Sequence, residues 1–122
     1  MSESNNNPFQ GHQRIIQEFV PGKQVTLAHV IANPDSSLAS KIGLVGDHGG
    51  SMGVLTITPG EGAIIAADLA SKAAGIQLSF VDRFSGSLVI TGSLSDVESG
   101  VESIVKGLHE ILGFTPTSIT RT

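Results

Sequence analysis

One stretch constrains the fold more than any other: residues 53–92 alternate between strand-like and helix-like segments. Gly53 to Ile57 is short and rich in β-branched residues, which is typical of a strand. Thr58 to Glu61 then matches a capping box, with the threonine as N-cap and the proline at the first helical position. The helix is predicted to run to about Ala74 and to end at the glycine that follows.

Two further strands complete this stretch. Ile76 to Phe84 is predicted to be the second strand, and the turn Ser85 to Ser87 leads into a third, Leu88 to Thr91. A βαβ unit followed by a hairpin predicts a sheet with helices on one side.

The helix between the first two strands is rich in alanine and therefore thin enough to lie close to a sheet. Its buried stripe is predicted to be Ile65, Leu69 and Ala73. Asp68 and Lys72 stand four residues apart in the order that favours a weak ion pair on the wet face.

Composition limits the classes of protein this chain can belong to. With 122 residues it is expected to form one domain with a real core. A net charge of −4 and only seven Lys and Arg argue against a nucleic-acid partner. No apolar run approaches the roughly 18 residues that cross a membrane, so we expect no membrane partner. The chain has no cysteine, which is compatible with the cytoplasm.

The whole chain divides into three parts. Residues 1–13 are polar and rich in asparagine, and are expected to be a flexible tail. Residues 14–22 contain a short apolar strand, Arg14 to Val20, and a Pro-Gly turn. Residues 23–122 are predicted to form the single domain.

The domain is predicted to open with a strand over Gln24–Ala32. Alternation along this strand places four residues on one face: Val25, Leu27, His29 and Ile31. A short helix to about Ile42 follows, with Leu38 and Ile42 turned inward, and then a glycine-rich loop over Leu44–Ser51.

Ser95 to Leu112 shows the clearest helical pattern. Ser95 to Glu98 matches a second capping box, and Gly113 ends the helix. The apolar stripe comprises Val97, Val101, Ile104, Val105, Leu108, Ile111 and Leu112. Residues 114–122 could add an edge strand. The predicted order is β-β-α-β-α-β-β-α, an α+β sandwich.

Two glycine motifs are weak candidates for chemistry. Gly49 to Gly53 matches G-x-S-x-G, but a nucleophile elbow needs a strand before the serine and a helix after it, and here a loop precedes and a strand follows. Gly60 to Gly62 lies where a dinucleotide loop would lie, but the third glycine is replaced by Ile65. The first stretch is interpreted as a flexible loop, and the second lacks the glycine that a close approach of helix and strand needs.

The histidines are not predicted to form a metal site. His12, His29, His48 and His109 show no spacing that would place two ligands together. His29 is expected to be a partly buried, hydrogen-bonded strand residue. No set of nucleophile, base and orienting group is visible, so no catalytic residue, metal or cofactor is predicted and the chain is expected not to be an enzyme.

Three blocks of sequence resemble a known family. They are RIIQEFVPGKQVTLAHVIANP at 14–34, TITPGEGAIIAADLASKA at 56–73 and DRFSGSLVITGS at 82–93. These blocks are similar to those of the circularly permuted single-domain (BMC-domain) shell proteins of bacterial microcompartments, of the kind that encloses ethanolamine- and propanediol-utilisation pathways. The resemblance covers roughly residues 14 to 122.

The resemblance implies a permuted ferredoxin-like α/β sandwich that forms a flat homohexamer. In this family the strand and short helix that match 24–43 ordinarily come last, and here they come first. A ring of this kind follows from heterologous contacts with a closing rotation. The turn that matches the pore loop comprises Arg83, Phe84, Ser85, Gly86 and Ser87.

The same resemblance assigns two further surfaces. The N-terminal strand, comprising Arg14, Ile15, Ile16, Gln17, Glu18, Phe19 and Val20, resembles a segment that forms a six-stranded β-barrel over the pore. Lys72 matches the lysine at the edge between neighbouring hexamers; its alternative is an exposed lysine paired with Asp68. Asn33 stands where the family usually has an arginine, so lateral packing is expected to differ from that of a standard tile.

The implied function is a shell component of a microcompartment in the bacterial cytoplasm. Its partners would be copies of itself, other shell proteins and encapsulated cargo enzymes. The alternative is a small oligomeric ligand-binding or regulatory α+β module, for which the glycine-rich loop at Gly46 to Gly50 is the best feature. An enzyme that uses Ser51 ranks third.

Overall fold

The computed structural model describes residues 22–44, 50–73 and 75–122. Within them the elements are β1 (Gln24–Ile31), α1 (Leu38–Lys41), β2 (Ser51–Thr58), α2 (Gly62–Ala73), β3 (Gln77–Asp82), β4 (Ser87–Gly92), α3 (Leu94–Leu112) and β5 (Thr120–Arg121). From the second predicted strand onward the predicted order is confirmed, and β5 is the edge strand that residues 114–122 could add. The predicted strand at 14–20 lies outside the described residues.

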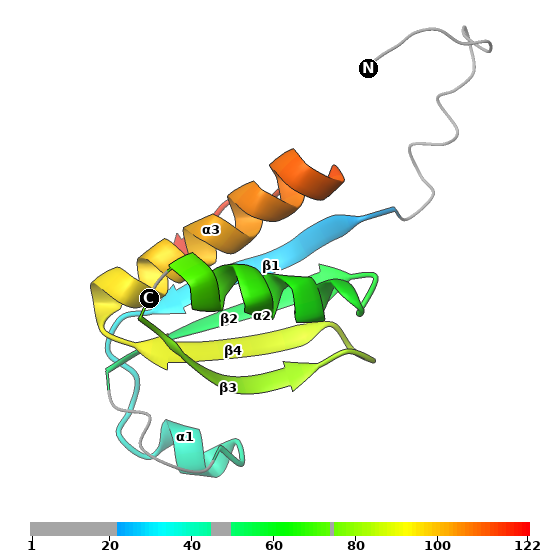
Figure 1. Ribbon diagram of the computed structural model, residues 1–122. Helices are drawn as coiled ribbons and strands as arrows, with labels where there is room; N and C mark the ends of the chain where they lie inside the picture. The colour runs from blue at the N-terminus through cyan, green and yellow to red at the C-terminus, as the bar shows by residue number, and fades with distance from the viewer. Residues whose placement is uncertain (1–21, 45–49, 74) are drawn as a thin grey trace, which may run out of the picture.

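The five strands form one sheet in the order β3-β4-β2-β1-β5 (Figure 1). β2 pairs antiparallel with β1 and with β4, β3 pairs antiparallel with β4, and β5 runs parallel to β1. Because β2 and β3 are both antiparallel to β4, they are parallel to each other. The predicted βαβ unit is therefore present, with β4 inserted between its two strands.

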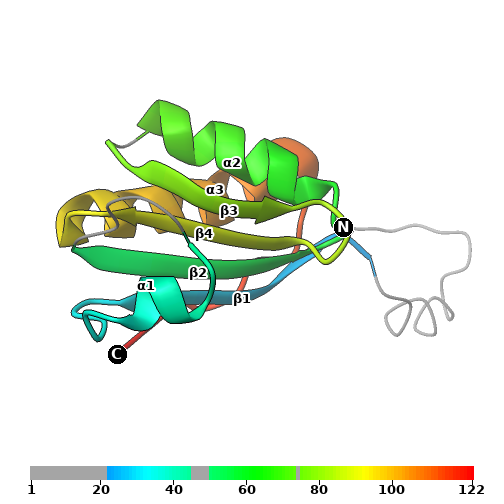
Figure 2. The ribbon, with the colours of Figure 1, turned by 90° about the horizontal axis from the view of Figure 1, so that it is seen from below.

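Two helices cover one face of the sheet and the short α1 lies on the other (Figures 1 and 2). The main core lies between the sheet and the pair α2 and α3, and includes Leu55, Ile90, Ile104 and Leu108. A smaller cluster of Leu44, Met52 and Val89 lies on the opposite face, with Leu38 packed against it. No helix in the described ranges is long and apolar enough to cross a membrane.

The register of β1 differs from simple alternation. Val25 is buried together with Ala28 and Val30, whereas Leu27 is 42% exposed. The pairing with β2 shifts between Val25 and Leu27. One extra residue in a strand moves each side chain beyond it to the opposite face of the sheet. The prediction that Val25, Leu27 and His29 share one face is therefore wrong at Val25.

Helix α3 follows its predicted apolar stripe for most of its length. Val97, Val101, Ile104, Val105 and Leu108 are buried. Ile111 was expected in the stripe but is 69% exposed, whereas Leu112, the next residue, packs against the core. The N-cap is Ser93, whose hydroxyl accepts from the Asp96 amide at 3.2 Å, so the predicted cap at Ser95 is two residues too late.

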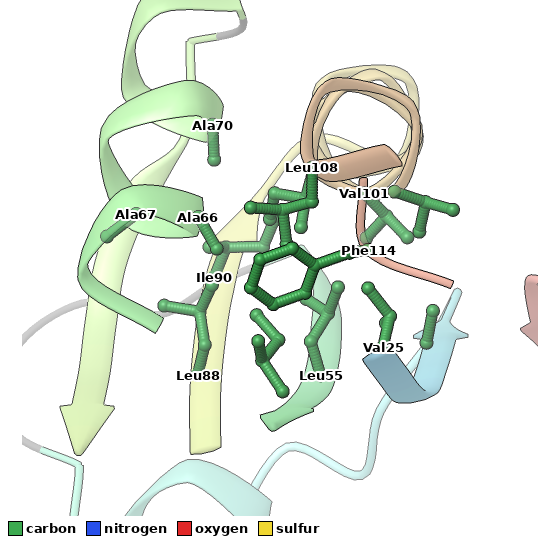
Figure 3. Packing of buried hydrophobic residues seen from close by; sticks show 14 of the residues in the cluster. Val25, Leu55, Ala66, Ala67, Ala70, Leu88, Ile90, Val101, Leu108 and Phe114 are labelled. Atoms are coloured by element: carbon green, nitrogen blue, oxygen red, sulfur yellow. The ribbon is translucent and has the colours of Figure 1, made fainter. Parts of the chain in front are cut away.

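The C-terminal end of α3 returns the chain to the core. Gly113 ends the helix as predicted, with a left-handed φ of 72° that favours glycine. The amides of Gly113 and Phe114 donate to the carbonyls of His109 and Leu108 at 3.0 and 3.1 Å. This turn directs the Phe114 ring into the middle of the core, where it is 3% exposed (Figure 3).

Helix α2 departs from its prediction at both its start and its buried face. Thr58 is the last residue of β2 and the helix begins only at Gly62, so the predicted capping box does not form. The buried residues are Gly62, Ala63, Ala66, Ala67 and Ala70, while Ile65 is 42% exposed and Ala73 is exposed. Figure 3 shows Ala66 and Ala70 directed toward the core.

The close approach of α2 to its neighbours explains this preference for small residues. A Cβ at Gly62 would lie 2.7 Å from Cγ2 of Ile57 on β2. A Cβ at Gly107 on α3 would lie 3.0 Å from Cδ1 of Leu69 on α2. At such separations the inner face of α2 has no room for a bulky side chain. Alanine therefore occupies this inner face, and the isoleucines of α2 lie on the outer face.

Helix α1 is shorter than predicted. The pattern predicts a helix from Asn33 to about Ile42, but only Leu38–Lys41 is helical. The Asp35 carboxylate accepts from the Ser37 amide at 2.9 Å and the Ser37 hydroxyl at 2.7 Å, which holds the preceding residues in a turn. Leu38 packs inward as predicted, whereas Ile42 is 50% exposed.

Candidate functional site: the β3–β4 turn and the assembly surfaces

The turn between β3 and β4 is built on one carboxylate. β3 ends at Asp82 rather than at the predicted Phe84. Oδ1 of Asp82 accepts from the Phe84 amide and Oδ2 accepts from the Ser85 hydroxyl, both at 2.9 Å. The Gly86 amide donates to the Asp82 carbonyl at 2.8 Å. An aspartate followed by a serine and a glycine thus closes the turn with its own side chain.

These hydrogen bonds favour the ionised form of Asp82. The Phe84 amide, followed by the Ser85 hydroxyl, lowers the pKa of Asp82 below its ordinary value of 3.8. A lowered folded-state pKa means that the stabilisation is present above the unfolded-state pKa and is lost as the pH falls through the folded-state pKa. The turn is therefore held in full at neutral pH and loosens only in acid.

The backbone of the turn also packs against the backbone of the segment that joins β2 to α2. The Ile57 amide donates to the Gly86 carbonyl at 2.9 Å. Gly86 has a φ of 78°, and a Cβ there would collide with the Ile57 carbonyl oxygen. A Cβ at Gly60 would collide with the Arg83 carbonyl oxygen. Both glycines are needed for this approach, which fixes the position of the turn in the fold.

Two side chains project from the fixed turn. The Phe84 side chain is 84% exposed, and the Arg83 guanidinium lies 4.9 Å from the centroid of its ring. This cation–π contact orients both groups. Ser85 is exposed, and its hydroxyl lies 3.0 Å from Oγ of Ser87, which is half-buried. The five residues of the predicted pore loop therefore lie on one rigid turn at one end of the sheet.

The predicted edge residues lie on the surface. The Lys72 ammonium and the Asp68 carboxylate lie 2.8 Å apart, and their side chains are 74% and 58% exposed. The predicted i,i+4 pair is thus confirmed, and at this exposure it contributes little to stability. Asn33 is exposed just beyond the end of β1. The role of both residues at an edge between hexamers stays a prediction.

Apolar side chains are exposed along α2 and β3. They are Ile64, Ile65, Leu78, Phe80 and Val81, each between 40% and 52% exposed. Among the described strands, β3 lies at one edge of the sheet. Exposed apolar side chains at the edge of a sheet indicate a surface that another chain covers.

Two other candidate residues from the sequence, Ser51 and His29, have structural roles in the fold. Ser51 is 2% exposed inside β2, and its hydroxyl donates to the Ala32 carbonyl at 2.7 Å, so it is not placed to be a nucleophile. His29 is partly buried and hydrogen-bonded as predicted, with its ring nitrogens 2.6 Å from Oγ1 of Thr120 and 2.9 Å from Oγ1 of Thr122. Of the glycine-rich loop at Gly46 to Gly50, only Gly50 lies within the described residues.

Within the described ranges, no group of three or more His, Asp or Glu side chains could hold a metal ion. The segment Arg14 to Val20, assigned to the pore-capping barrel, lies outside these ranges. Sequence reasoning missed the role of Gly60, whose closeness to Arg83 is a contact across the fold. The glycine itself was visible, but it was assigned to a helix cap that does not form.

With this geometry established, comparison with known proteins identifies the class. Residues 51–120 match the model of the BMC domain. The chain belongs to the BMC-domain family.

Individual relatives cover nearly the whole chain. The bacterial microcompartment shell protein EutS of Escherichia coli is 54% identical over 109 residues, which is 89% of this chain and 96% of the relative. The shell protein PduU of Salmonella typhimurium is 51% identical, over 89% of this chain and 93% of the relative. The solved structure described as the CutR flat hexamer, form 1, is 48% identical, with a TM-score of 0.78, and covers 90% of this chain and all of that one.

Proposed function

We propose that this chain is a structural shell protein of a bacterial microcompartment and that it assembles into a cyclic homohexamer. The observation that carries the proposal is the agreement in fold with the CutR flat hexamer over 90% of the chain. The exposed apolar side chains on α2 and β3 support it, because a ring needs a surface on each subunit that its neighbour covers.

We propose that the function is geometric rather than catalytic. In the assembled ring the turn at Arg83–Ser87 lies at the central axis and sets the pore, while Lys72 and Asn33 lie at the edge between hexamers. The rigidity of the turn supports a pore role, because a pore of defined size needs a lining that does not move. Such a protein would act in the shell of the organelle, in the bacterial cytoplasm, with other shell proteins and cargo enzymes as partners.

A circular permutation would explain the match to the family model. The matched residues begin at Ser51, the first residue of β2, although β1 pairs with β2 from Met52 to Thr58 in the same sheet. The domain therefore includes a strand and a short helix that precede the matched region. A permutation is tolerated when the original termini lie close together at the surface.

We further propose that the N-terminal strand, Arg14 to Val20, caps the pore by forming a six-stranded barrel in the hexamer. One strand has no partner of its own, whereas six strands can close with no free edge. Deletion of residues 1–21 is expected to leave the hexamer intact and to remove the cap. A monomeric truncated chain would instead show that the barrel holds the ring together.

The first test is the solution mass of the purified chain, by light scattering behind size exclusion, with negative-stain images of the same peak. A mass six times that of the chain with disc-shaped particles supports the proposal. A monomer or dimer without discs contradicts it and favours a small ligand-binding module. Because Asn33 replaces the usual arginine, the pure protein is also expected to form extended flat sheets less readily than standard tiles do.

A further inference from the structure

The exposed apolar side chains of β3 lie on both faces of the sheet. Val81 is paired with Leu88, which belongs to the main core between the sheet and the helices α2 and α3. Phe80 is paired with Val89, which belongs to the smaller cluster on the opposite face. Paired residues of antiparallel strands direct their side chains to the same face of the sheet. Val81 therefore lies on the face that α2 and α3 cover, and Phe80 lies on the face that carries α1.

A β-bulge in β3 produces this arrangement. The pairing of β3 with β4 shifts between Leu78 and Phe80, so Ser79 is an extra residue in β3. Simple alternation from Leu78 would place Phe80 on the helix face, and the bulge re-aims it to the other face. The Ser79 hydroxyl lies 2.9 Å from Oγ1 of Thr91, which is buried in β4. The position of Phe80 is therefore fixed by the fold.

Both faces of β3 leave apolar surface in contact with water. The Phe80 side chain is 44% exposed and the Val81 side chain is 40% exposed. Leu78 lies on the same face as Val81, and α2 exposes Ile64 and Ile65 on that side of the sheet. A partner that contacted only the helix face would cover these residues and leave the Phe80 ring in water. Covering the ring as well removes more apolar surface from water, which favours a contact on both faces.

The edge position of β3 makes such a contact possible. Among the described strands β3 is at one end of the sheet order, so another chain can approach both of its faces. A bulge disrupts the hydrogen-bond ladder and is a device by which edge strands resist pairing with a further strand. Contact through side chains is therefore favoured over a strand added to the sheet. Phe80 and Val81 are consecutive residues on opposite faces, so a chain that closes around the edge covers both.

We propose that the neighbouring copy of the chain in the ring straddles the edge at β3, covering Val81 on one face of the sheet and Phe80 on the other. This inference rests on the proposed function, which supplies the second copy. It extends the contact from α2 and the helix face of β3 onto the face that carries α1. The two surfaces are continuous, since Phe80 and Val81 are adjacent. A contact on both faces of one strand also resists rotation of a subunit about the edge of its neighbour.

The test uses the absence of cysteine from the chain. Phe80→Cys, Val81→Cys and Leu27→Cys are each made in the full-length protein, and the rate of labelling by a maleimide is measured where light scattering shows the ring. Leu27 is the matched control, because it is 42% exposed and lies on the same face as Phe80. It belongs to β1, which β4 and β2 separate from β3.

If the neighbour straddles the edge, Phe80→Cys and Val81→Cys both label many-fold more slowly than Leu27→Cys in the hexameric protein. Phe80→Cys that labels as fast as Leu27→Cys overturns the inference, and slow labelling of Val81→Cys in the same experiment leaves the ring in place. Equal protection at all three positions also overturns it, since the whole face that carries α1 is then covered.

Dilution separates cover by a neighbour from cover by the chain itself. Below the concentration at which the ring dissociates, the labelling rate of Phe80→Cys should rise to that of Leu27→Cys. Protection at Phe80→Cys that persists in the monomer overturns the inference. A folded Phe80→Cys protein that is monomeric where the unsubstituted chain is hexameric supports it, because the ring then depends on the Phe80 side chain. If the unsubstituted chain is itself monomeric, the proposed function fails and the inference fails with it.

Discussion

Helices α2 and α3 cover the same face of the same sheet, yet they pack in opposite ways. α3 buries its bulky residues, with Val97, Val101, Ile104 and Leu108 all inaccessible to solvent. α2 buries alanines and leaves Ile64 and Ile65 52% and 42% exposed. The two helices are also in close contact with each other, where Gly107 of α3 meets Leu69 of α2.

The difference shows that an apolar stripe predicts the buried face only where space is available for it. α3 buries branched side chains against the sheet because Gly53 on β2 leaves room for Val97 and Val101, and the largest apolar residues gain most from burial. On α2, alanines occupy the inner face and Leu69 packs against α3 as predicted, whereas Ile64 and Ile65 face outward. Those outward residues are free to contact another subunit, which is the use we propose for them.

The largest expected effect is the loss of a bulky residue from α3. Ile104→Ala should lower the free energy of unfolding by about 2–5 kcal/mol, because the side chain is fully buried and its removal leaves a cavity. Urea denaturation at one fixed protein concentration measures it, since assembly makes stability depend on concentration. Ile111→Ala is the control and should change stability by less than about 0.5 kcal/mol. Equal losses from both variants would contradict the assigned face of α3.

The opposite substitution tests α2. Ala66→Leu should destabilise the fold by about 1–3 kcal/mol, because the added carbons have no space between helix and sheet. Ala73→Leu places the same side chain on an exposed position of the same helix and should be close to neutral. Paired thermal melts of the two variants give the comparison. A neutral Ala66→Leu would mean that α2 does not pack as closely as described.

The start of α3 gives a smaller effect that separates the observed cap from the predicted one. Ser93→Ala removes the hydroxyl that accepts from the Asp96 amide and should cost about 1 kcal/mol. Ser95→Ala, at the position that the sequence pattern favoured, should change stability by only a few tenths of a kcal/mol. The same denaturation measurement serves for both. A larger effect at Ser95 would restore the predicted boundary.

The smallest expected effect on folding comes from the outer face of α2. Ile65→Ser should change the free energy of unfolding of a single subunit by less than about 0.5 kcal/mol, since the side chain is 42% exposed. The mass of the assembly on dilution, by light scattering, should nevertheless fall earlier than that of the unsubstituted chain. An unchanged assembly would remove Ile65 from the proposed subunit contact.

Much of the site followed from local sequence. The hairpin was predicted from the serine and glycine residues at 85–87, and Asp82 fixes its start by bonding to residues only two and three positions away. Local signals of this kind are visible in a sequence because the groups that interact are neighbours in the chain. The exposed position of Lys72 and its pairing with Asp68 were predictable for the same reason.

Other features could not be read from the sequence because they depend on distant parts of the chain. Thr58 to Glu61 resembles a helix cap, but the chain stays in the sheet up to Thr58 because that residue pairs with Gln24. The shift in register after Val25 depends on how β1 pairs with β2. The alternation of residues within β1 carries no information about that pairing.

The sequence by itself determined the order of the elements from Gln24 onward, the end of α3 at Gly113 and the β3–β4 hairpin, since each depends on short-range periodicity, capping or turn chemistry. Only the tertiary structure decided which face of α2 is buried, where Phe114 packs and why Gly60 and Gly86 must lack side chains. Those features are set by the distance between elements that are far apart in the chain, and a one-dimensional pattern carries no measure of that distance.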